Sequence, residues 1–185
     1  ISSDGTVAVY STLITSWTDY IGFLSDGNSY KLKRLDNRTD GTYTFFKLIP
    51  SDGKSVLFDP VKLVSGDAVK LGQSIVSLSG ESHDVVSTGL VQSLLQREIK
   101  QPSSEGTSTN SVIVKSTYAL ETNIRDSVVN SPLLNLSGEV IGVKTPQYES
   151  AYIYSTTDTL QKEFSRFLEA QKPVVATSTA TTTSK

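Results

Sequence analysis

Side chains that can act as nucleophiles, bases or metal ligands are scarce in this chain of 185 residues. It contains no cysteine, which excludes a thiolate nucleophile, a disulfide bond and a cysteine-bound metal. His83 is the only histidine, so any mechanism that needs an imidazole base must use it. Two interpretations of His83 stay open: a catalytic base, or a surface or turn residue in the stretch GESHDV.

A metal site at His83 is disfavoured by the residue next to it. Asp84 follows His83 directly, and adjacent side chains of a strand point to opposite faces of the sheet. One histidine and one carboxylate in this arrangement make a poor site for a single ion. The sequence therefore implies no metal and no other cofactor.

Charge and composition argue against several classes of function. The formal net charge is −2 at pH 7, from 17 Lys and Arg against 19 Asp and Glu, and the basic residues are scattered along the chain. Without a basic cluster there is no electrostatic case for a nucleic-acid partner or an anionic membrane surface. No apolar run approaches the roughly 18 residues that a membrane-spanning helix needs, so we expect no transmembrane segment.

Short runs of alternating polar and apolar residues dominate the chain up to Ser155. Examples are TVAVYSTLI, SYKLKRL, TYTFFKLI, QSIVSLSG and NSVIVKSTYAL. Asp, Asn and Gly stand between the runs, as in SDGN, SDGK and SGE, and supply the backbone conformations that hairpins and tight turns require. Many short strands at this spacing predict an antiparallel β-barrel or sandwich.

The periodicity changes from Asp158 onward. Apolar residues recur at i, i+4, i+7 and i+8 from Leu160, which predicts one amphipathic C-terminal helix docked on the β core. Asp158 or Thr157 is expected as its N-cap. The polar stretch 100–110 is predicted to be an exposed loop between two strands. After Pro173, the sequence VVATSTATTTSK predicts a linker, a stalk or a frayed tail.

Several runs follow one another in an order that is specific. SPLLNLSGEVIGVKT is similar to the L-N-x-x-G-E-V-I-G-I-N-T sequence that follows the G-N-S-G-G-P-L motif in the trypsin-like domain of HtrA/Deg serine proteases. SSDGTVAVYSTLI resembles the family's D-G-Y-I-V-T-N-N-H-V-V segment, which carries the catalytic histidine. LSDGNSYKLKRLDNRTDGTYTFFKL resembles its L-S-D-G hairpin and the R-T-D-L-A-V-L-K-I strand that carries the aspartate. The resemblance spans Ser3 to Phe167.

This resemblance implies an all-β fold of two antiparallel six-stranded barrels with one C-terminal helix. The family's opening strand would lie upstream of Ile1, so the first barrel is expected to be incomplete at its N-terminus. The expected division is a first lobe at residues 1–60, a second lobe at 61–155, the helix at 156–172 and a Ser/Thr/Ala-rich linker or tail at 173–185.

The same resemblance predicts that the catalytic triad is lost. Counting by the family's spacing puts the histidine position on Thr12, the aspartate position on Thr42 and the serine position on Val129. Threonine cannot act as a base near neutral pH, and valine has no nucleophilic atom. The two glycines of the motif become Asn130 and Ser131, which puts side chains where a tight oxyanion loop needs unusual backbone angles. We therefore expect no catalysis.

Two alternative assignments keep an active enzyme open. Ser127 becomes the nucleophile if Asp126-Ser127 aligns with the D-S of a G-D-S-G-G-P motif, and otherwise it is a loop serine that caps a turn. Asp40 matches the family's R-T-D letters if the next two residues are an insertion. The base is the obstacle, because His83 follows Asp40 whereas the family's histidine precedes its aspartate.

By resemblance we expect a non-catalytic domain, a pseudoprotease that binds a protein or an extended peptide in the cleft between the barrels by β-augmentation. The family also implies homo-oligomers, as trimers or larger assemblies, and an extracytoplasmic location in the envelope or on the cell surface. A structural subunit of an extracellular assembly is one alternative, since a strand of a neighbouring chain can complete an open barrel. An active serine protease that uses Ser127 is the other.

Overall fold

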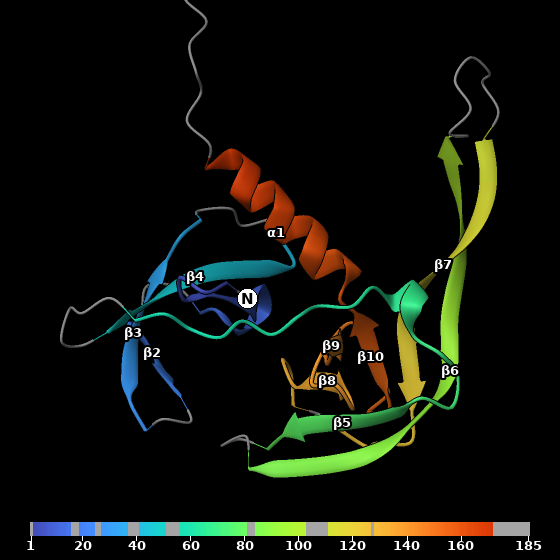
Figure 1. Ribbon diagram of the computed structural model, residues 1–185, viewed down its shortest axis with the longest axis horizontal. Helices are drawn as coiled ribbons and strands as arrows, with labels where there is room; N and C mark the ends of the chain where they lie inside the picture. The colour runs from blue at the N-terminus through green and yellow to red at the C-terminus, as the bar shows by residue number, and fades with distance from the viewer. Residues whose placement is uncertain are drawn as a thin grey trace, which may run out of the picture.

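The structure is a computed structural model that describes residues 2–15, 19–24, 27–36, 41–50, 56–80, 84–102, 111–126 and 128–171. Within these ranges the chain is mostly β, with one α-helix, α1 (Asp158–Ala170), after the last strand. The strands form two sheets, one open and one closed (Figure 1). No helix in the described part of the chain is long and apolar enough to cross a membrane.

The first sheet is open and antiparallel, with the strand order β1-β4-β3-β2. Its strands are β1 (Thr6–Tyr10), β2 (Tyr20–Phe23), β3 (Ser29–Arg34) and β4 (Tyr43–Pro50). β4 is buried on both faces, because successive side chains of a strand alternate. Phe45 stacks on the helix residue Phe167, whereas Phe46 contacts Tyr20 of the edge strand β2.

The second sheet closes on itself as a six-stranded barrel in the order β10-β7-β6-β5-β8-β9. Its strands are β5 (Ser74–Ser79), β6 (Val85–Pro102), β7 (Ser111–Thr122), β8 (Pro132–Asn135), β9 (Val140–Val143) and β10 (Ile153–Thr156). Inward-facing side chains fill the barrel, among them Ile75, Leu120, Leu133 and Ile141. Burying each such side chain contributes about 1.5–3 kcal/mol, so the barrel carries a core of its own.

Helix α1 covers one face of the first sheet (Figure 1). The ring centroids of Phe164 and Phe167 lie 5.5 and 4.8 Å from that of Phe45. Both helix residues belong to the apolar stripe that the periodicity predicts, and aromatic contacts of this kind add about 0.5–1.5 kcal/mol each to the burial itself. The predicted C-terminal helix and its docking on the β core are therefore confirmed.

The start of α1 has Thr157 at the N-cap, one of the two predicted residues, but lacks a side-chain capping bond. Thr157 occupies the N-cap position, but its hydroxyl donates to the carbonyl of Val64 and makes no capping bond. Asp158 does not cap the helix either, since its carboxylate accepts from the N–H of Gly66 at 2.9 Å and from the hydroxyl of Ser65 at 2.7 Å. The first turn of the helix is thus anchored to the segment that precedes β5, because both side chains find partners there.

The distal parts of β6 and β7 continue beyond the barrel as a two-stranded ribbon (Figure 1). We call this ribbon the arm; it pairs residues 96–102 of β6 with residues 111–117 of β7. The prediction of a loop from residue 100 is wrong for its first three residues, because β6 continues to Pro102. The rest of that predicted loop lies outside the described residues.

The predicted fold is confirmed in part. The structure contains one closed six-stranded barrel, one open sheet and the C-terminal helix, whereas the resemblance predicts two six-stranded barrels, the first of them incomplete at its N-terminus. The four strands described for the first sheet do not return from β2 to β1, so that sheet stays open along both strands. The predicted tail at 173–185 lies outside the described residues.

Candidate functional site

Hydrogen bonds join residues next to the three positions where the resemblance places the triad. Thr12 lies in the short 3-10 helix Ser11–Leu13, directly after β1. The N–H of Ser11 donates to the carbonyl of Thr42 at 2.9 Å. One residue earlier, the N–H of Tyr10 donates to the side-chain oxygen of Asn130, the neighbour of Val129, at 3.1 Å. The end of β1 is therefore bonded to the segment of Thr42 through Ser11 and to the neighbour of Val129 through Tyr10, at the contact between sheet and barrel.

A carboxylate of α1 holds the segment around Thr42. Glu163 accepts the N–H of Thr42 with one oxygen and the N–H of Tyr43 with the other, both at 3.0 Å. On the β1 side, the hydroxyls of Ser11 and Thr44 lie 3.0 Å apart and form a hydrogen bond. Burial raises the pKa of the Tyr43 phenol well above its ordinary value, and the nearby Tyr10 and Glu163 act in the same direction.

The backbone at Asn130 adopts the left-handed conformation, with φ of 75°. Its N–H donates to the carbonyl of Lys144, while the N–H of Lys144 donates to the carbonyl of Ser131, both at 2.9 Å. Two residues thus face one, which is the arrangement of a β-bulge. Asparagine adopts positive φ more readily than most other side-chain-bearing residues, so Asn130 can hold this backbone angle without glycine.

The segment before Val129 is fixed by Asp126, whose side chain is buried. One carboxylate oxygen accepts from the hydroxyls of Ser77 at 3.2 Å and Tyr154 at 3.1 Å. The other oxygen accepts from the N–H of Val128 at 2.9 Å. Burial raises the pKa of Tyr154; the hydrogen bond to Ser77 opposes this shift and Asp126 adds to it. Asp126 therefore organises the turn from inside the barrel.

Lys144 is the buried cation of this region, with 4% of its surface exposed. Its ammonium group donates to the carbonyls of Ser150 at 2.5 Å and Ile153 at 2.8 Å, and it lies 5.5 Å from the ring centroid of Tyr154. Burial lowers the pKa of Lys144, and the charge of Asp126 counteracts this effect. The lysine thus clamps the segment before β10 with its own hydrogen bonds.

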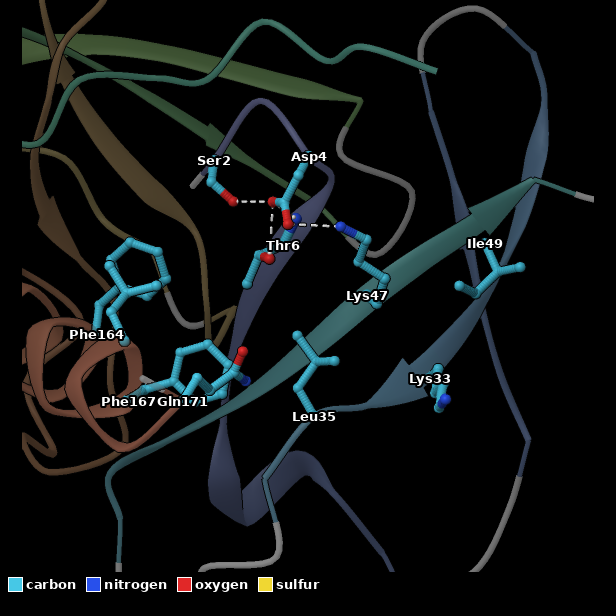
Figure 2. Close-up of a pocket in the computed structure, with 11 residues that line it drawn as sticks. Ser2, Asp4, Thr6, Lys33, Leu35, Lys47, Ile49, Phe164, Phe167 and Gln171 are labelled. Atoms are coloured by element: carbon cyan, nitrogen blue, oxygen red, sulfur yellow. Dashed lines mark hydrogen bonds and ion pairs between the residues drawn. The ribbon is translucent and has the colours of Figure 1, made fainter. Parts of the chain in front are cut away.

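A separate groove lies between the outer face of the first sheet and the C-terminal end of α1. Figure 2 shows its residues, and its volume is about 450 Å³. The helix contributes Phe164 and Phe167, and the strands contribute the apolar residue Ile49 and the cation Lys33. None of the described lining residues is one of the three triad positions.

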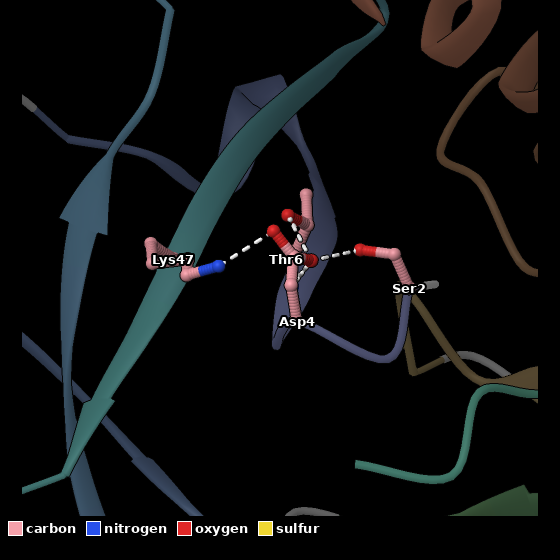
Figure 3. Close-up of polar contacts among 4 residues, drawn as sticks. All are labelled: Ser2, Asp4, Thr6 and Lys47. Atoms are coloured by element: carbon pink, nitrogen blue, oxygen red, sulfur yellow. Dashed lines mark hydrogen bonds and ion pairs between the residues drawn. The ribbon is translucent and has the colours of Figure 1, made fainter. Parts of the chain in front are cut away.

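Asp4 closes one side of this groove with a set of polar contacts (Figure 3). Its carboxylate accepts from the ammonium group of Lys47 at 2.6 Å, from the hydroxyl of Thr6 at 2.9 Å and from the hydroxyl of Ser2. The hydrogen bond from Lys47, helped by that from Ser2, holds the pKa of Asp4 well below its ordinary value. Because Asp4 is largely exposed, solvent screens this pair.

Three residues singled out from the sequence lie outside the described residues: His83, Asp40 and Ser127. Their assignment as base, carboxylate and nucleophile stays a prediction. Among the described residues, no group of three or more histidine, aspartate or glutamate side chains is placed to hold a metal ion.

The sequence did not reveal the roles of three residues: Glu163 as an acceptor for backbone N–H groups, Asp126 as a buried acceptor and Lys144 as a donor to backbone carbonyls. Glu163 lies three residues from the predicted apolar position Leu160, yet nothing in the helical pattern reveals that its partners are backbone groups. Asn130 carried a usable signal, since asparagine is enriched among the non-glycine residues with positive φ.

Comparison with known proteins adds no family to this picture. No family model and no curated protein matches the chain. The fold and the residues around Thr12, Thr42 and Val129 are therefore the basis for a functional proposal.

Proposed function

We propose that this chain is a non-catalytic domain of trypsin-like architecture that binds an extended segment of another protein where the open sheet meets the barrel. The observation that carries the proposal is the hydrogen-bonded contact that joins the surroundings of Thr12, Thr42 and Val129. A true triad requires this convergence of three distant segments. Hydrogen bonds join neighbours of the three positions, which supports this reading, while the residue types at the positions themselves lack the chemistry.

The chemistry at these positions argues against turnover. A serine-protease site needs a nucleophilic oxygen, an imidazole that takes its proton and a carboxylate that holds the imidazole. Thr12, Thr42 and Val129 supply neither a base nor a nucleophile activated by one. Loss of a complete triad costs about 10⁶ in kcat, which leaves binding as the function that this arrangement supports.

Exposed side chains next to the contact between sheet and barrel support binding there. Thr12 is exposed, and Leu13 next to it has 44% of its surface accessible. The backbone on both sides is held by Asn130 and Glu163, so a bound chain would meet a rigid surface. A surface that is ordered before binding loses little conformational entropy in the complex. Extended segments commonly bind through main-chain hydrogen bonds with apolar side chains as anchors.

The test uses fluorescein-labelled β-casein as an extended, unfolded polypeptide and measures its fluorescence anisotropy with the full chain. We expect saturable binding without cleavage on a gel. Thr12→Lys and Leu13→Glu should each weaken binding at least tenfold. Leu136→Glu is the matched control, because Leu136 is 76% exposed in the turn between β8 and β9 and should leave binding unchanged. Equal loss in the control, or no binding at all, contradicts the proposal.

The alternative enzyme is distinguished in the same samples. If Ser127 is a nucleophile, β-casein is cleaved and a fluorophosphonate probe labels the chain, and both effects vanish in Ser127→Ala. If the chain is a binding domain, the wild type stays unlabelled and the casein stays intact. Cleavage that depends on Ser127 would replace the proposed function by catalysis.

A further inference from the structure

The arm is a ribbon of two strands with no third strand beside it in the described structure (Figure 1). β6 pairs with β5 only through residues 74–79 opposite 85–90, and β7 pairs with β10 only through residues 119–121. An isolated two-stranded hairpin is marginally stable in water. The arm therefore leaves two strand edges open for pairing.

The hydrogen-bond pattern identifies which backbone groups of the arm point outward. The N–H of Thr117 donates to the side chain of Asp67 at 2.6 Å, so it faces away from β6. Gln96 and Thr117 are therefore a pair without backbone hydrogen bonds between them, and their backbone groups point outward. Along an antiparallel ladder such pairs alternate with hydrogen-bonded pairs. Because the register has no shift from residue 96 to 102, the outward residues of β6 are 96, 98, 100 and 102.

Proline at position 102 fits this assignment independently. Proline has no N–H and is tolerated in a strand where that group would face away from the neighbouring strand. Pro102 pairs with Ser111 at the end of β6, and the alternation places its missing N–H on the outer edge. Two unrelated observations, one at each end of the arm, thus give the same set of outward residues.

The outer edge of β6 is complementary to itself. Glu98 and Lys100 are both exposed, both outward and placed symmetrically around Ile99. If two copies of β6 pair antiparallel about Ile99, Glu98 of each copy lies opposite Lys100 of the other. Each such pair exchanges two backbone hydrogen bonds and also joins opposite charges on one face of the sheet. A shift of the centre to residue 98 or 100 instead sets like charges opposite one another.

The outer edge of β7 lacks this complementarity. Its outward residues include Ile113 and Lys115, so pairing about Val114 sets a lysine opposite an isoleucine. The next outward N–H, that of Thr117, is already bonded to Asp67. Charged residues on an edge strand normally prevent pairing. On β6 the charges of Glu98 and Lys100 have opposite signs. They therefore favour pairing in the one register that sets each opposite the other.

We propose that two copies of this chain associate through the outer edges of β6, antiparallel about Ile99, so that the two arms form a four-stranded sheet. The two-fold axis makes the contact closed, which limits it to a dimer. The contact is small and includes two pairs of charges, so the association is weak and decreases with salt. It uses none of the residues of the proposed binding site at Thr12, which lies in the 3-10 helix after β1.

The first experiment measures the mass of the full chain by sedimentation velocity over a range of concentrations. The wild type should shift from monomer to dimer as concentration rises. Glu98→Lys and Lys100→Glu should each be monomeric at every concentration, because each places like charges opposite. Mixing these two variants should restore the dimer, since both charge pairs across the two-fold axis then join opposite charges. Ile113→Thr on the β7 edge is the control and should dimerise like the wild type, because it leaves Lys115, which lies opposite Glu98 within the arm, in place.

The second experiment uses the absence of cysteine from the chain. Ile99→Cys should form an intermolecular disulfide under mild oxidation, because residues facing each other across the two-fold axis lie about 4.5 Å apart at Cα, within disulfide range. Lys115→Cys is the control and should stay uncrosslinked. A wild type that stays monomeric overturns the proposal, as does crosslinking at position 115 in preference to 99 or failure of the mixed variants to associate.

Discussion

The side-chain oxygen of Asn130 accepts the backbone N–H of Tyr10 at 3.1 Å, and this bond joins the barrel to the edge strand of the open sheet. Asn130 reaches Tyr10 from a left-handed backbone conformation with φ of 75°. The same residue therefore serves the turn and the contact between the two sheets. Its replacements separate these two roles.

Asn130→Gly should keep the turn and lose only the bond to Tyr10, whereas Asn130→Ala should lose the bond and strain the turn. We expect Asn130→Gly to lower the free energy of unfolding by about 1 kcal/mol, the value of one hydrogen bond, and Asn130→Ala by about 1 kcal/mol more. Urea unfolding followed by tryptophan fluorescence measures both. Equal values for the two variants would show that the backbone angle contributes nothing.

Glu163→Gln should weaken the attachment of α1 to the open sheet. The carboxylate accepts two backbone N–H groups with two oxygens, and glutamine offers a single carbonyl oxygen. We expect a loss of roughly 1–3 kcal/mol in the free energy of unfolding, as for a charged hydrogen bond with a buried partner. Glu169→Gln is the matched control on the same helix, because Glu169 is exposed, and it should stay within about 0.5 kcal/mol of the wild type.

Asp126→Asn should destabilise the barrel more than an exposed substitution of the same kind. The carboxylate accepts three hydrogen bonds with its two oxygens. In asparagine an NH₂ group replaces one oxygen, so at least one of the three donors faces another donor and loses its bond. The expected loss is about 1.5–3 kcal/mol. Asp59→Asn at an exposed position is the control. A loss no larger than that of the control would mean that the buried carboxylate is not held by these three donors in solution.

Tyr43 should make the chain sensitive to alkaline pH. Its pKa is raised in the folded state, chiefly by burial, so the folded chain keeps a proton that the unfolded chain releases above pH about 10. Stability is therefore complete below that pH and falls as pH rises toward the folded value. Tyr43→Phe should reduce the slope of unfolding free energy between pH about 10 and 12 by about 1.4 kcal/mol per pH unit. Urea unfolding at several pH values measures it, and an unchanged slope would contradict the assignment.

The sequence predicts those parts of the fold whose signals are local. The alternation of residues gives the strands, and the spacing from Leu160 gives a helix whose Phe164 and Phe167 pack on the sheet. The loop predicted from residue 100 is wrong at its start because proline is typical of loops. Only the pairing register reveals that the missing N–H of Pro102 faces outward. A local pattern cannot contain that information.

The candidate site is predicted less completely, since its side chains bind backbone N–H and C=O groups of distant segments. Glu163 binds the backbone of Thr42 and Tyr43, and Lys144 binds the carbonyls of Ser150 and Ile153. A backbone partner leaves no residue type in the sequence to recognise. The positions Thr12, Thr42 and Val129 could be named only through the resemblance.

The stacking of Phe164 and Phe167 on Phe45 has a consequence for synthesis of the chain. A ribosome adds about 5–20 residues per second, so β4 is complete on the order of ten seconds before the helix that covers it. During that interval the nascent chain presents an uncovered aromatic face, which is a natural target for a chaperone and a starting point for aggregation. Slow codons placed before α1 would lengthen this exposure.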